Sequence, residues 1–176
     1  MNNIEVELKV FISEQKYNEL LDFFTKNAEF LKKDNQETYY FDCKEDFRIQ
    51  KNDYFSKLVW KSGKVHDHQR EEIEIKFDKD DFSKSERLLK LLGFDVGIKW
   101  FRERTDFKWN DISISVDFTK GYGYILELEK MSSEQDKEKT EEYLKEILKS
   151  LNLELTPREE FEKKFKYYKE NWRILI

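Results

Sequence analysis

Strict alternation of apolar and charged residues is the feature of this sequence that most restricts its fold. In "IEVELKV" (residues 4–10) every second residue is Ile, Leu or Val, and the residues between them are Glu or Lys. "QREEIEIKF" (69–77) repeats the pattern. Neighbouring side chains of a β-strand point to opposite faces, so a period of two predicts strands with one apolar and one charged face.

Eight segments of this kind, some of them short, predict a mostly antiparallel sheet. Amphipathic segments with helical spacing lie between and after them. Eight strands can close into a barrel wide enough for side chains or one small ligand. We therefore expect an α+β fold: an eight-stranded antiparallel β-barrel (tunnel) with helices packed outside and C-terminal helices, in a single domain over 1–176. The expected strands cover 4–10, 37–42, 47–50, 55–61, 69–77, 98–109, 112–118 and 124–130, and the expected helices cover 13–30, 80–92, 132–151 and 156–172.

The last two helices carry their own start signals. Ser132 and Gln135 have the spacing of a capping box. Thr156 is placed to be an N-cap, with Pro157 at the first helical position and Glu159 completing a second box.

Composition limits the class of protein. Charged residues make up 40% of the 176-residue chain, but 16% are aromatic, too many for a disordered polymer. The 33 basic and 38 acidic residues are well mixed, which argues against a nucleic-acid partner. The lone cysteine, Cys43, suits a reducing compartment, and no apolar run or leader indicates a membrane. We expect a cytoplasmic protein without a membrane partner.

The charged strand faces could point to water or to a lumen. In a sandwich the apolar faces meet and the charges are solvated, and alternation alone favours that arrangement. Two features favour a charged lumen. The amphipathic helices need an apolar partner, which the outer faces of a barrel supply, and Glu-x-Glu recurs three times and Arg-x-Arg once along the strands.

A charged lumen must be wet, internally paired or filled by an ionic ligand, because burying an unpaired ion is costly. Clustered carboxylates attract a hard divalent cation, and clustered Lys and Arg attract phosphate. A metal-bound polyphosphate would satisfy both. The candidate acids are Glu5, Glu7, Glu72, Glu74, Asp117, Glu127 and Glu129, and the candidate bases are Lys9, Arg48, Lys61, Arg70, Arg102 and Arg104.

The order of the motifs adds a family resemblance. "EVELK" matches an ExExK signature, "REEIEIKF" an RxExE strand, and "RERTDF" a K-x-R-x-x-Tyr strand. "SVDFTKGYGYILELE" has an Asp, a glycine-rich turn and a Glu-x-Glu strand. From residue 4 to 130 this series resembles the CYTH superfamily, the triphosphate tunnel metalloenzymes. In the third motif Arg102 takes the lysine place and Phe107 the tyrosine place. Two departures are Gln50, where the family often has a second Arg after Arg48, and Tyr122-Gly123, where it usually has Leu-Gly.

The resemblance implies roles for the candidates. It implies that the metal, Mg²⁺ or Mn²⁺, is bound by Glu5, Glu7, Glu127 and Glu129. It implies that the substrate, a triphosphate-containing small molecule, is gripped by Lys9, Arg48, Lys61, Arg70, Arg102 and Arg104. Glu72, Glu74 and Asp117 complete the acidic side, and with Lys9 they are the catalytic candidates.

These roles predict metal-dependent hydrolysis of a triphosphate, inorganic or organic. One alternative is a class IV adenylyl cyclase, which the same grip would serve by presenting the α-phosphate of ATP to its ribose 3′-hydroxyl. Another is a non-catalytic polyphosphate-binding module. We expect a monomer or a homodimer.

Two tryptophans are further candidates, for stacking on a substrate ring. Trp60 is next to Lys61 on the same predicted strand and so points to the opposite, apolar face, which favours packing under the helices. Trp100 shares the parity of Arg102, so it lies either at the mouth of the tunnel or beyond a bulge.

Overall fold

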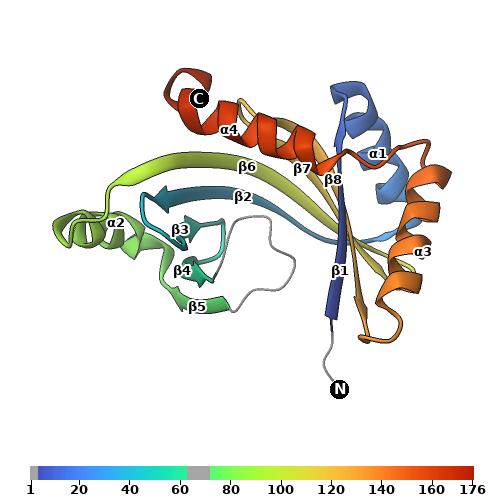
Figure 1. The fold of residues 1–176 in the computed structure, drawn as a ribbon, viewed down its shortest axis with the longest axis horizontal. Coiled ribbons are helices and arrows are strands. Elements are labelled where there is room, and N and C mark those ends of the chain that lie inside the picture. The colour runs from blue at the N-terminus through green and yellow to red at the C-terminus, as the bar shows by residue number, and fades with distance from the viewer. Residues whose placement is uncertain (1–3, 63–71) are drawn as a thin grey trace. The chain divides into compact units, whose positions relative to one another are not determined.

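The structure, a computed structural model, describes residues 4–62 and 72–176, except the side chains of Ile4 and Glu72. Most of the described residues lie in eight strands and four α-helices (Figure 1). The strands are β1 (Ile4–Ile12), β2 (Glu29–Phe41), β3 (Asp46–Lys51), β4 (Ser56–Lys61), β5 (Glu72–Phe77), β6 (Val96–Trp109), β7 (Ile112–Thr119) and β8 (Gly123–Ser132), and the helices are α1 (Glu14–Asn27), α2 (Phe82–Leu91), α3 (Lys137–Ser150) and α4 (Arg158–Leu175), with a 3₁₀ turn over Lys79–Asp81.

The strands form one sheet in the order β1-β8-β7-β6-β2-β3-β4-β5. This confirms an α+β fold with eight antiparallel strands. β1 and β5 stand at the two ends of the order, so the sheet is not closed over the residues that are described. The closed barrel stays a prediction.

The predicted elements are present, with some ends displaced. β2 begins at Glu29, eight residues before the predicted start, and the helix predicted over 13–30 ends at Asn27. The early part of β2 is largely polar after Leu31, so it lacks the alternation that marks a strand. The first three residues of the strand predicted over 69–77 lie outside the described residues.

Ser132 and Thr156, the residues predicted to begin the last two helices, form other hydrogen bonds in the structure. Ser132 belongs to β8, and α3 begins only at Lys137, because the N–H of Asp136 bonds to Ser133 in a turn before the helix. The capping box predicted from Ser132 to Gln135 is therefore wrong. The Thr156 hydroxyl accepts a hydrogen bond from the N–H of Phe11, at 2.8 Å, so it bonds to β1.

The described chain divides into two compact units, each built from two separate segments. Unit 1 combines the chain up to Lys33 with Glu103–Tyr167, and unit 2 combines Asp34–Arg102 with Tyr168–Ile176. The long strands β2 and β6 contribute residues to both. The prediction of a single domain stays a prediction.

The core of unit 1 lies between its strands and two helices. α1 contacts β7 and β8, and α3 contacts β1 and β8 (Figure 1). The apolar strand faces supply completely buried side chains to this core, among them Val10, Ile114 and Leu128. Removing such a side chain from water is worth about 1.5–3 kcal/mol. The apolar faces are thus covered by helices, which leaves the opposite faces to the charged residues.

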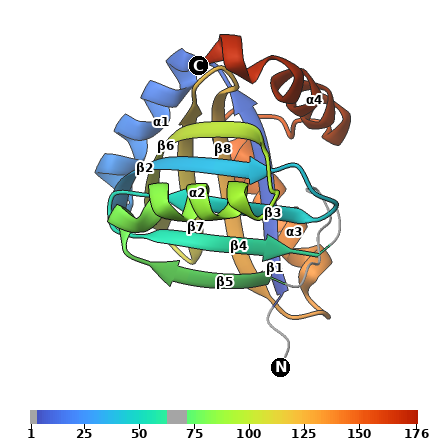
Figure 2. The same cartoon turned by 90° about the vertical axis from the view of Figure 1, so that its left-hand side faces the viewer.

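In unit 2 a helix again covers an apolar face of the strands. α2 runs along the strands, in front of β3 in Figure 2, and packs Phe82 and Leu89 against Tyr39 and Ile49. Trp60 lies directly opposite apolar residues of both neighbouring strands, and its packing under the helices stays a prediction.

The last turns of α4 also belong to unit 2. The Tyr168 hydroxyl donates to the carbonyl of Lys99, and the Trp172 indole donates to the carbonyl of Gly97. The Trp100 ring packs edge-on to Tyr168, at 4.9 Å between ring centres. None of the helices in the described ranges is long and apolar enough to cross a membrane.

Candidate functional site

Four predicted metal ligands gather on one strand pair of unit 1. The β1–β8 register places Glu7 directly opposite Glu129, and Lys9 directly opposite Glu127. Glu5 lies two residues before Glu7 and therefore on the same face. This face is opposite to the one that packs on α1 and α3. We call it the charged face of unit 1; its residues are Glu5, Glu7, Lys9, Arg104, Asp117, Glu127 and Glu129.

Arg104 connects the strands of this face. Its Nε and Nη2 donate to the two carboxylate oxygens of Asp117 at 2.8 and 2.5 Å, and Nη2 also donates to Glu127 at 2.5 Å. Asp117 is 1% exposed. Burial opposes the charged guanidinium, but the two carboxylates raise the pKa of Arg104 above its ordinary value. The guanidinium stays charged and fixes both carboxylates.

Lys9 lies between two glutamates. Its Nζ is 2.9 Å from Glu7 Oε1 and 3.4 Å from Glu127 Oε1. Burial would lower the pKa of Lys9, but the negative charges of Glu127 and Glu7 outweigh it and raise that pKa. Lys9 is thus a cation held at the centre of the carboxylates.

The carboxylates repel one another. The pKa of Glu129 is raised to about 7, mainly by burial and also by the charge of Glu5, the hydrogen bond with Glu5 and the charges of Glu7 and Glu127. Burial also raises the pKa of Glu7, and Glu127 and Glu5 add to this against the opposing charge of Lys9. A proton or another cation on this face would relieve the repulsion.

The donor set fits a hard divalent cation. Mg²⁺ and Mn²⁺ prefer carboxylate oxygens, and a shared cation would offset the repulsion that raises the pKa of Glu7 and Glu129. Within the described ranges, no three carboxylate, imidazole or thiol side chains converge into a ready ligand shell. Side-chain rotation would therefore accompany binding, while the strands already place the donors on one face.

Unit 2 carries the other cationic candidates. The Nη1 of Arg48 donates to the hydroxyl of Tyr40 at 2.7 Å, and its Nε is 3.6 Å from a carboxylate oxygen of Asp46. Arg102 donates to Gln36 through Nε and Nη2. Both guanidinium groups are oriented by side chains of neighbouring strands.

The remaining candidates lie on β4 and β5. The register pairs Lys61 with Glu72, and Val59 with Glu74. Glu74 accepts a hydrogen bond from Lys57 at 2.6 Å. Burial would raise the pKa of Glu74, but Lys57 and Lys76 lower it, so this carboxylate is ionised and paired. Arg70 and the side chain of Glu72 lie outside the described residues.

Sequence reasoning missed several partners of the predicted residues. Lys57 has the parity of Lys61 on the same predicted strand, so the alternation could have identified it. Tyr40 and Gln36 gave no such signal. Tyr40 stands beside another tyrosine, and Gln36 precedes the predicted strand.

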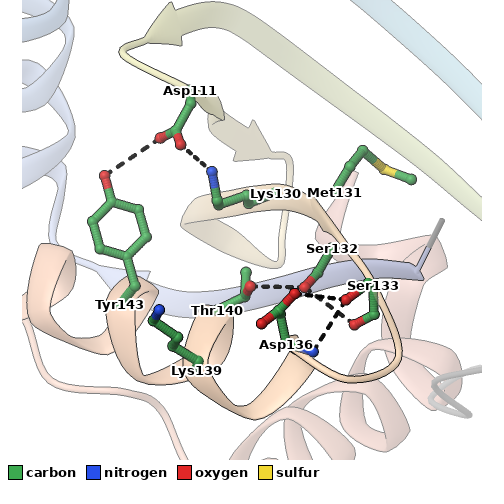
Figure 3. A pocket seen from close by; sticks show the side chains of 9 residues that line it. All are labelled: Asp111, Lys130, Met131, Ser132, Ser133, Asp136, Lys139, Thr140 and Tyr143. Atoms are coloured by element: carbon green, nitrogen blue, oxygen red, sulfur yellow. Dashed lines mark hydrogen bonds and ion pairs between the residues drawn. The ribbon is translucent and has the colours of Figure 1, made fainter.

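A separate hollow of about 630 Å³ lies in unit 1, between the end of β8 and the first turns of α3 (Figure 3). Asp111 on its wall bonds to both Lys130 and Tyr143, and Ser132 bonds to Thr140. None of the predicted site residues lines it. Most of its polar groups bond to one another, and we assign it no function.

Comparison with known proteins identifies the family. The model of the family described as CYTH domain matches residues 3–165. A protein of Methanocaldococcus jannaschii, provisionally named an adenylate cyclase, is 35% identical over 162 residues, which cover 85% of this chain and 90% of that protein.

Solved structures have the same fold. A conserved hypothetical protein of Pyrococcus furiosus is 27% identical, with a TM-score of 0.69 over 88% of this chain and 96% of that one. A protein of Hippeastrum is 20% identical, with a TM-score of 0.64 over 86% of this chain and 89% of that one. It is provisionally named an adenylyl cyclase, and its structure is described as revealing a dominant triphosphatase activity.

Proposed function

The chain belongs to the CYTH family, and from this premise we propose that it is a metal-dependent triphosphatase acting on an inorganic or organic triphosphate. One observation carries the proposal: Glu5, Glu7, Glu127 and Glu129 share a strand face with Lys9 and Arg104. A site for binding phosphate alone would need the bases but not four mutually repelling carboxylates. The closed eight-stranded tunnel expected from the sequence is part of the proposal.

The four glutamates would hold the metal, Mg²⁺ or Mn²⁺. Bound there, the metal would neutralise phosphate oxygens and polarise the scissile bond. Lys9 lies beside Glu7 and Glu127 and would contact the same phosphate group. Phosphoryl transfer depends mainly on positioning and charge neutralisation, which this arrangement supplies.

The remaining candidates would bind and orient the substrate. Arg48, Lys61, Arg70 and Arg102 would grip the phosphate chain. Asp117 would act by holding Arg104, because its carboxylate accepts two hydrogen bonds from that guanidinium. Glu72 and Glu74 remain candidates to orient the attacking water.

Adenylyl cyclase activity is the second candidate. The Methanocaldococcus jannaschii relative, at 35% identity, favours it by its provisional name. The same grip on phosphates would then direct the ribose 3′-hydroxyl of ATP at the α-phosphate and release pyrophosphate. Cytoplasmic location, the absence of nucleic-acid and membrane partners, and a monomer or homodimer stay predictions from the sequence.

One experiment separates the candidates. The protein is incubated with tripolyphosphate, thiamine triphosphate or ATP, each with Mg²⁺ or Mn²⁺, and orthophosphate, pyrophosphate and cyclic AMP are measured together. Metal-dependent orthophosphate release is expected. Cyclic AMP as the main product would replace the triphosphatase by the cyclase, and binding without any product would favour the non-catalytic module.

A variant pair ties the activity to the site. Glu7→Gln should lower turnover by at least about 10–100-fold, the loss expected when a metal shell is perturbed. Glu146→Gln makes the same chemical change on the exposed side of α3 and should leave turnover unchanged. Equal activity of both variants would refute the assignment of Glu7.

A further inference from the structure

A glutamine outside the predicted site holds one of the predicted phosphate-binding arginines. The Nε and Nη2 of Arg102 both donate to Oε1 of Gln36, at 3.0 and 2.5 Å. Gln36 lies on β2 and is only 7% exposed. Two donors converging on one buried acceptor fix the direction in which the guanidinium plane points.

The orientation of the Gln36 amide is itself determined by a buried carboxylate. Nε2 of Gln36 donates to Oδ2 of Asp34 at 3.1 Å, and Asp34 is completely buried. An ionised carboxylate only accepts hydrogen bonds and a guanidinium only donates them. Only one orientation of the amide serves both neighbours, with its oxygen towards Arg102.

The carboxylate is anchored in turn. Oδ1 of Asp34 accepts from the N–H of Asp53 at 3.1 Å, and the Asp53 carboxylate accepts two bonds from Asn35, at 2.8 and 3.0 Å. The side-chain oxygen of Asn52, the residue before Asp53, accepts hydrogen bonds from two backbone N–H groups of the turn that follows it. Side chains that are bonded at both ends in this way have little freedom to reorient.

The acceptor that Gln36 offers Arg102 is a neutral amide oxygen. Gln36 therefore orients the guanidinium without adding a negative charge next to it. A group that must bind an anion gains from such a partner.

We propose that Gln36 and Asp34 are positioning residues for phosphate binding: Asp34 orients the Gln36 amide, and Gln36 holds the Arg102 guanidinium ready for an oxygen of the triphosphate. This inference rests on the proposed function, because it takes Arg102 as a phosphate-binding residue. Holding a flexible side chain in its bound orientation before binding is worth roughly threefold to tenfold in affinity.

The test is a double-mutant cycle read by direct binding. Tripolyphosphate binding is measured calorimetrically in EDTA, without metal and therefore without turnover, for the wild type, Gln36→Met, Arg102→Met and the double variant. Gln15→Met, on the exposed side of α1, is the matched control, and thermal unfolding of each variant checks the fold. Gln36→Asn, which keeps an amide but is one methylene shorter, replaces Gln36→Met if that variant does not fold.

We expect Gln36→Met to weaken binding about threefold to tenfold. It should have no further effect when Arg102 is already methionine, because Gln36 acts through that residue. Asp34→Asn should weaken binding by a smaller factor. Additive losses in the double variant, or unchanged affinity of a folded Gln36→Met, would overturn the inference while the substrate assignment stands. A wild type that does not bind tripolyphosphate in EDTA would also overturn the inference, whereas the proposed function would still be decided by turnover of the three triphosphates with metal.

Discussion

The guanidinium of Arg104 donates a hydrogen bond to each carboxylate oxygen of Asp117, and the carboxylate is almost wholly buried. The same guanidinium reaches Glu127, so one side chain of β6 fixes acids on both β7 and β8. A pair of this kind is strongly coupled to the fold, because removing one partner leaves a buried charge without its counter-ion.

We expect Arg104→Met to lower the free energy of unfolding by about 3–5 kcal/mol, since Asp117 would lose its partner. Urea denaturation at pH 7 measures the change. Arg158→Met removes an exposed guanidinium that pairs with Glu162 on α4, and it should cost less than about 1 kcal/mol. Equal losses from both substitutions would show that the Arg104 pair is no more important than a surface pair.

The raised pKa of Glu129 predicts an unusual dependence of stability on pH. Its pKa is about 7 in the folded protein, above the ordinary value of 4.5, so the folded state keeps a proton that the unfolded state has lost. The contribution of this group to stability is complete below pH 4.5 and is lost as the pH rises to 7.

Glu129→Gln removes this dependence. In EDTA, the variant should be more stable than the wild type at pH 8, by about 1–2 kcal/mol after allowance for solvent screening, and should have no such advantage at pH 4.5. Urea denaturation of both proteins at the two pH values tests this. A difference that does not change with pH would argue against the repulsion among the glutamates.

The hydroxyl of Tyr40 accepts a hydrogen bond from Arg48, and this contact should affect substrate binding more than stability. We expect Tyr40→Phe to raise KM for the triphosphate about threefold to tenfold, because Arg48 loses a fixed partner, with little change in kcat. Steady-state kinetics measure both constants. Tyr54→Phe, at a 60% exposed position, is the control. A fall in kcat at constant KM would contradict a role in binding.

The sequence predicts which faces are charged, because parity along a strand is a local property. The alternation around Glu7 places it opposite to the buried Val10 side, and the structure confirms this. The register that sets Glu7 against Glu129 could not be predicted, since it joins segments about 120 residues apart. Repulsion between those two carboxylates follows from the register alone.

Other features depend on partners that no local pattern reveals. Thr156 has the sequence context of a helix cap, yet its hydroxyl bonds to Phe11, 145 residues away. Gln36 lies in a polar stretch without alternation, and its place beside Arg102 depends on the arrangement of β2 and β6. Local signals predict elements and faces, whereas the pairing between distant segments decides what each polar side chain does.

Ligands should stabilise the protein in two separable parts. A ligand at about 100 times its dissociation constant stabilises the folded state by about 2.7 kcal/mol, which corresponds to a rise in Tm of roughly 5–10 °C for a chain of this size. Tripolyphosphate in EDTA should produce part of the rise through the arginines and lysines, and Mg²⁺ added with it should produce a further rise through the glutamates.

Glu7→Gln separates the two contributions. Glu7 pairs with Lys9 and lies opposite Glu129, so its loss should remove most of the rise that depends on Mg²⁺ and leave the rise in EDTA in place. Glu146→Gln should respond as the wild type does. Differential scanning fluorimetry measures the Tm of each protein without ligand, with tripolyphosphate in EDTA, and with tripolyphosphate and Mg²⁺. If Glu7→Gln kept the full response to Mg²⁺, the metal would have to bind away from the charged face of unit 1.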